Sequence, residues 1–186
     1  DDAMVLAFAL AGLALSLAPP PAGAVDAHVH VAPSEIPRAV ALFDRVGVDW
    51  ALNLSAGWPS LGQGPGPFDV RLRAARASGR VLIAVNLPWG AATDPRFPEL
   101  AVAILERAAA RGARALKIEK ALGLAVRGPD LERLPVDAPL LDPVWRAAGR
   151  LGLPVVIHTA DPRAFWDPPT PDNERHEELS AHPSWS

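Results

Sequence analysis

Short apolar stretches alternate with longer amphipathic ones along the chain from residue 25 onward. The apolar stretches predict β-strands at 25–31, 49–55, 80–87, 114–119 and 154–159. The intervening stretches predict helices at about 35–46, 68–78, 98–111 and 142–151. A glycine follows each helix, where the chain favours a residue without a Cβ. Strands that alternate with helices in this way are parallel and are joined by right-handed crossovers.

Two folds fit this alternation: an open doubly wound sheet and a closed (β/α)8 barrel. No glycine-rich phosphate loop follows the first strand, which weakens the nucleotide-binding form of the open sheet. A barrel carries its chemistry at the C-terminal ends of its strands, and the polar residues of this chain gather there. They are His30, Asn53, Ser55, Asn86, Lys117, Glu119 and His158. We therefore predict an α/β fold of the (β/α)8 (TIM) barrel type.

The pattern contains five strands, followed by a proline-rich stretch and a short helix within 173–181. A barrel of five strands has an open edge and an unfilled interior. The expectation is that residues 25–186 are the N-terminal portion of a barrel that continues beyond Ser186. The alternative, a complete small α/β domain, has no closing element after the fifth strand.

Residues 1–24 differ from the rest. Residues 4–18 are uncharged and almost wholly apolar, and Ala22-Gly23-Ala24 resembles a signal-peptidase site. We predict a signal-peptide-like leader over 1–24, export to the periplasm or medium, and no stable membrane association once the leader is removed. The positive residues that normally begin such a leader are missing, so a membrane anchor or a disordered apolar leader are the alternatives.

Composition limits the partners. A net charge of −3 gives no reason to expect nucleic acid, and the absence of cysteine excludes disulfides and thiolate metal ligands. The expected partner is a small-molecule substrate, and the sequence leaves a homo-oligomer open.

The most informative stretch is Asp26-Ala27-His28-Val29-His30. On a strand, His28 and His30 lie on one face and can reach one ion, and imidazole nitrogen suits zinc and its neighbours. His158 at the end of the fifth strand is the candidate third ligand, which would leave a coordination position open for water. The cofactor is thus predicted to be a divalent metal, with Zn²⁺ the first choice. The alternative is that these histidines only form hydrogen bonds within the protein.

Four other residues are candidates for roles in the site. Asp26 would orient one of the histidine rings from behind. Lys117, flanked by apolar residues on the fourth strand, would act in catalysis, either by binding a substrate carboxylate or by becoming carbamylated. An equal alternative is that Lys117 only forms an ion pair with Glu119. Asn53 and Trp166 would contact substrate, although a turn role for Asn53 and loop packing for Trp166 are simpler.

The sequence also resembles the amidohydrolase superfamily, and within it the amidohydrolase-related branch that includes aminocarboxymuconate-semialdehyde decarboxylase-like enzymes. The motifs are Val-Asp-Ala-His-Val-His at 25–30, Gly-Ala-Arg-Ala-Leu-Lys-Ile at 112–118 and Leu-Gly-Leu-Pro-Val-Val-Ile-His-Thr-Ala-Asp-Pro at 151–162. The resemblance implies that His28, His30 and His158 match family metal ligands. It also implies a further histidine and a catalytic aspartate, which would lie beyond Ser186.

The first functional hypothesis is a metal-dependent hydrolase that uses an activated water to cleave an amide, lactone or ester. The second keeps the site but changes the reaction to non-oxidative decarboxylation, a lyase chemistry. The third is that this polypeptide is an inactive truncated fragment.

Overall fold

The computed structural model of the chain describes residues 23–62, 64–159 and 161–183. The predicted leader therefore lies outside the described residues, apart from Gly23 and Ala24. All five predicted strands and all four predicted helices are present, and their boundaries differ from the predicted ones by at most two residues. The strands are β1 Ala24–Val29, β2 Val48–Asn53, β3 Val81–Val85, β4 Ala115–Ile118 and β5 Val155–Ile157. The helices are α2 Ile36–Val46, α3 Pro67–Ser78, α4 Phe97–Arg111, α5 Asp142–Arg150 and α6 His176–Ala181.

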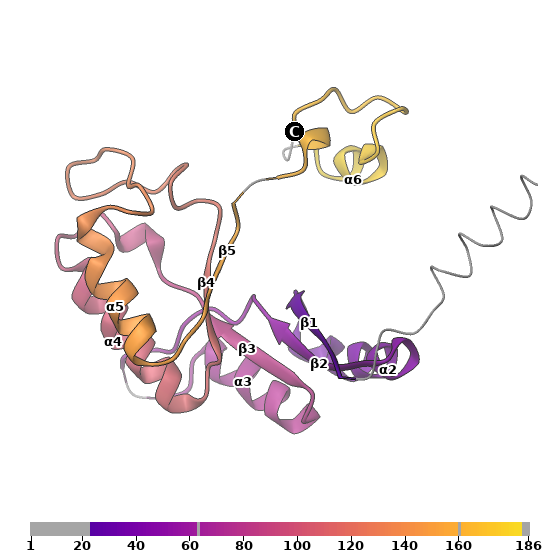
Figure 1. The fold of residues 1–186 in the computed structure, drawn as a ribbon, viewed down its shortest axis with the longest axis horizontal. Helices are drawn as coiled ribbons and strands as arrows, with labels where there is room; N and C mark the ends of the chain where they lie inside the picture. The colour runs from indigo at the N-terminus through magenta and orange to yellow at the C-terminus, as the bar shows by residue number, and fades with distance from the viewer. Residues whose placement is uncertain (1–22, 63, 160, 184–186) are drawn as a thin grey trace, which may run out of the picture.

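The five strands form one parallel sheet in the order β1-β2-β3-β4-β5. Neighbours in sequence are neighbours in space, as the (β/α) repeat requires. The sheet is curled, with α2 to α5 outside it, so the fold is a half-barrel of the predicted TIM-barrel type (Figure 1).

The two faces of the sheet are packed differently. The outer face carries large apolar residues such as Ile83, Leu116 and Ile118, which pack with the helices into the main core. The inner face carries a smaller cluster built around Leu54, Ala84 and Ala115. Because side chains alternate along a strand, the polar residues that continue this inner face end up at the C-terminal edge of the sheet.

The ends of α3 and α4 are fixed by specific contacts, of which the sequence predicted only the glycine that follows the helix. Gly112 closes α4 with a φ of 100°, and a Cβ at this position would lie 2.8 Å from the Arg76 guanidinium. Asp69 in the first turn of α3 accepts a hydrogen bond from the Gly66 amide at 2.7 Å and pairs with Arg111 of α4. This ion pair joins α3 to α4.

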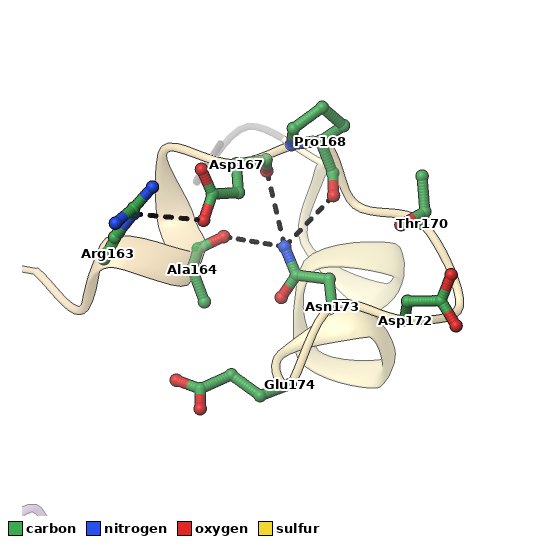
Figure 2. A pocket seen from close by; sticks show the side chains of 8 residues that line it. All are labelled: Arg163, Ala164, Asp167, Pro168, Thr170, Asp172, Asn173 and Glu174. Carbon is green, nitrogen blue, oxygen red and sulfur yellow. Dashed lines mark hydrogen bonds and ion pairs between the residues drawn. The ribbon is translucent and has the colours of Figure 1, made fainter.

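Beyond β5 the chain forms a separate segment that carries a short 3-10 helix, Arg163–Phe165, and α6 (Figure 1). Its loop is held by Asn173, whose side-chain amide donates to the carbonyls of Ala164 at 2.8 Å and Pro168 at 3.1 Å (Figure 2). Within the described part of the chain, no helix has the length and apolar character needed to cross a membrane.

Candidate functional site

The end of β1 carries the histidine pair, and an irregularity in the strand sets their geometry. Asp26 pairs with Ala51 of β2 and Val29 with Asn53, so three steps along β1 correspond to two along β2. Such a bulge re-aims the side chains beside it. Asp26 Oδ1 accepts a hydrogen bond from the His28 backbone amide at 3.0 Å within this bulge. The Asp26 carboxylate therefore contacts the backbone of His28, whereas a ring contact had been expected.

The two imidazoles approach each other closely. His28 Nε2 lies 3.1 Å from His30 Nε2, and their ring centroids are 5.1 Å apart. Two nitrogens bound to one tetrahedral zinc at about 2.0–2.1 Å would be separated by about 3.3 Å. The 3.1 Å separation is that of a hydrogen bond between the two ring nitrogens, and it is slightly shorter than the separation of two zinc ligands.

Ser55, at the end of β2, orients one member of this pair. Its Oγ forms a hydrogen bond with His30 Nδ1, so His30 Nε2 is the nitrogen left facing His28. Partial desolvation of the ring, and then the nearby charges of His28, Lys117 and His158, lower the pKa of His30. A lowered pKa favours the neutral imidazole, which is the form that binds metals.

His158 lies just beyond β5, and its backbone amide bonds to the Ile118 carbonyl of β4 at 3.0 Å. Its Nε2 is 3.2 Å from Asp161 Oδ1, and the other carboxylate oxygen of Asp161 accepts from Lys120 Nζ at 2.6 Å. The hydrogen bond from Lys120 is the largest of the effects that lower the pKa of Asp161.

His30 and His158 line the same cavity, which has a volume of about 710 Å³. Its other lining residues are Lys120, Asp161, Pro162, Phe165, Arg175 and Glu178. Among the described residues, however, no three histidine or carboxylate side chains are placed to hold one ion together. The structure thus assembles the His28–His30 pair and brings His158 to the same cavity, without closing the three-histidine set.

Lys117 is buried in the inner face of the sheet, with only 3 % of its surface exposed. It lies opposite Val156 of β5 in the strand register, on the same face as Ala115. Its Nζ has no hydrogen-bond partner within the described part of the chain. Burial lowers the pKa of Lys117, and the negative charge of Glu119 opposes this effect.

The Glu119 carboxylate is engaged elsewhere. One oxygen accepts from Asn86 Nδ2 at 2.5 Å and the other accepts from the Trp89 indole N–H at 2.8 Å. Asn86 also accepts from the Gly57 amide at 2.7 Å, so this network joins the ends of β2, β3 and β4. Glu119 influences Lys117 through its charge and not through an ion-pair contact.

The two residues predicted to contact substrate have other surroundings. Asn53 is buried, donates to the Val31 carbonyl at 2.7 Å and accepts from the Ser55 amide at 3.1 Å. It therefore holds the histidine-bearing end of β1 against Ser55. Trp166 is 76 % exposed and does not line the cavity shared by His30 and His158.

Sequence reasoning did not assign site roles to Ser55, Asp161 or Lys120. Ser55 was among the polar residues expected at the strand ends, but its contact with His30 had no signal in the sequence. The spacing of three residues between His158 and Asp161 is a weak signal, since it becomes informative only when the loop after β5 folds back.

Comparison with known proteins identifies a family. A sequence model of a protein family described as "Amidohydrolase" matches residues 25–181, which is most of the chain. No curated protein and no solved structure matches the chain.

Proposed function

Because the chain belongs to the amidohydrolase family, we propose that it acts as a metal-dependent hydrolase on an amide, lactone or ester of a small molecule. Membership of this family supports hydrolase- or lyase-type chemistry in general. The observation that carries the finer proposal is the 3.1 Å approach of His28 Nε2 to His30 Nε2 at the C-terminal edge of the sheet.

In this proposal His28, His30 and His158 hold a divalent cation, with Zn²⁺ the first choice. The fit rests on donor chemistry, since neutral imidazoles are good zinc ligands and His30 is held in the required orientation by Ser55. When bound, the cation supplies a Lewis acid and an activated water nucleophile. Asn53 keeps the end of β1 in place beneath this group.

A metal-dependent decarboxylase is the second candidate, and Lys117 favours it. A buried ammonium without a partner is unstable unless an anion reaches it or its proton is lost. A substrate carboxylate at the inner face of the sheet would supply that anion. Lys117 would then orient a carboxylate-bearing substrate beside the histidines.

The test compares the two reactions on the zinc-loaded protein. A panel of lactones, esters and amides is assayed for hydrolysis, and a panel of aromatic carboxylates is assayed for release of carbon dioxide. Hydrolysis that is lost in His28→Ala supports the first proposal, and carbon dioxide release that is lost in both His28→Ala and Lys117→Met supports the second. Turnover that survives His28→Ala rejects a mechanism through the histidine pair.

We also propose that the protein is exported, on the strength of the apolar run over 4–18 and the Ala22-Gly23-Ala24 sequence. Mass spectrometry of protein recovered from the periplasm or medium should find an N-terminus at Val25. An uncleaved N-terminus would reject this proposal.

A further inference from the structure

We propose that Asp161 is a positioning residue that holds His158 in the Nε2–H tautomer and so leaves Nδ1 as the nitrogen that binds the metal. This inference rests on the proposed metal-dependent function, but it concerns a carboxylate to which neither the sequence reasoning nor the family match gives a role.

The two carboxylate oxygens of Asp161 have different partners. Oδ1 lies 3.2 Å from His158 Nε2, while Oδ2 accepts a hydrogen bond from Lys120 Nζ at 2.6 Å. The Asp161 side chain is 17 % exposed, and that of Lys120 is 48 % exposed. The lysine comes from the end of β4 and the histidine from the end of β5, so Asp161 joins the loop after β5 to two strand ends.

This arrangement determines which nitrogen of His158 carries the proton. A carboxylate paired with a lysine ammonium only accepts hydrogen bonds, so Nε2 must be the donor. The lone pair of the neutral ring is then on Nδ1. Histidines that bind metals commonly donate their second N–H to a carboxylate in this way, which fixes the tautomer and makes the ring a better ligand.

The other side of the cavity differs, because the oxygen that holds His30 is a hydroxyl, which can donate or accept a hydrogen bond. Ser55 Oγ bonds to His30 Nδ1, and His30 Nε2 faces His28 Nε2 at 3.1 Å, so these contacts orient the ring without choosing its tautomer. Of the two rings that line the cavity, His158 is therefore the one whose tautomer is fixed by a carboxylate.

The experiment compares Asp161→Ala, Asp161→Asn and the matched control Lys120→Met with the wild type. Both Asp161 variants and the control lose the ion pair between Lys120 and Asp161, but only the Asp161 variants change the partner of His158. The tautomer of His158 is read from two-bond ¹H–¹⁵N correlations of the metal-free protein. Zn²⁺ affinity is measured by competition with a chelator, and circular dichroism verifies folding.

We expect the Nε2–H tautomer in the wild type and in Lys120→Met, and a mixture of tautomers in Asp161→Ala. Zn²⁺ affinity should fall about 10- to 100-fold in Asp161→Ala relative to Lys120→Met, with Asp161→Asn between them because it keeps an acceptor oxygen. Retention of the Nε2–H tautomer in Asp161→Ala would overturn the inference, and so would an equal loss of affinity in Asp161→Ala and Lys120→Met.

Failure of the proposed function gives a different result. If His28→Ala and His30→Ala bind Zn²⁺ as tightly as the wild type, the metal site is rejected, while the tautomer measurement still decides whether Asp161 holds His158.

Discussion

Replacement of Lys117 by methionine should make the protein more stable. Methionine keeps the length of the side chain but removes an amine that is buried at 3 % exposure without a hydrogen-bond partner in the described part of the chain. An unsatisfied buried polar group costs about 1–3 kcal/mol. The methionine side chain would pack against an inner face whose neighbours, such as Ala115 and Val156, are apolar.

The expected size of the effect can be converted into a melting temperature. For a chain of this length, 1 kcal/mol corresponds to roughly 2–4 °C, so a gain of about 2 kcal/mol raises the Tm by about 6 °C. Differential scanning calorimetry of the metal-free protein at pH 7 measures this shift. The control is Lys120→Met, which removes a half-exposed lysine that is paired with Asp161 and should change stability by less than about 1 kcal/mol.

The pH dependence gives an independent check on the cause. Burial lowers the pKa of Lys117 in the folded protein, so the unfolded chain binds more protons between that value and the ordinary value of about 10.4. The stability of the wild type therefore rises with pH across this window, and the advantage of Lys117→Met shrinks there. A Tm that falls in Lys117→Met at pH 7 would refute the reasoning, because it would mean that the amine has a stabilising partner.

Three further predictions concern single residues. Leu131 is 68 % exposed and has a φ of 65°, a backbone conformation that is strained for a residue with a Cβ. Leu131→Gly should therefore raise the free energy of unfolding in urea by about 1 kcal/mol. The control Leu124→Gly, at an exposed leucine of ordinary φ, should not raise it. Asn53→Ala should cost about 2–4 kcal/mol by the same assay, because it leaves the Val31 carbonyl and the Ser55 amide without their partner. The pKa of His30 is lowered in the folded protein, so below about pH 6.5 the unfolded chain binds a proton at this residue before the folded chain does. The free energy of unfolding of the metal-free protein should therefore decrease as the pH falls through this window. If it depends on pH in the same way in His30→Asn as in the wild type, this cause is contradicted.

The fold was predictable because it depends on periodicity. Apolar runs fill both faces of a parallel sheet, amphipathic helices cover its outside, and each of these signals is local. The predicted positions of the strand ends were less accurate than those of the helix ends. β1, β2, β3 and β5 each end two residues before the predicted positions. After β2, the side chain of Asn53 bonds to the backbone of Val31 and Ser55.

The sequence named the candidate site residues, but it did not indicate how they are arranged. The His-x-His spacing predicted a shared face, yet the bulge at Asp26–Val29 that brings the rings together has no sequence signal that could be read in advance. Similarly, the choice of partners for Glu119 depends on where Asn86 and Trp89 lie in space, and it leaves Lys117 without the ion pair that was the alternative to a role in catalysis. Contacts between strand ends are set by register and curl, which are properties of the whole sheet.

The distribution of costly polar groups supports a functional C-terminal edge independently of the family match. The outer face of the sheet is largely apolar and well packed, whereas the inner face carries, in the described part of the chain, the buried and unpartnered amine of Lys117. A buried amine without a partner lowers stability relative to an apolar side chain. Nothing in the packing of the sheet requires this amine, since Ala84 and Ala115 show that small apolar residues fill the adjacent layer of the same face. The amine is the group that the proposed carboxylate-bearing substrate would meet, and the stability of Lys117→Met measures the stability that the chain loses by keeping it.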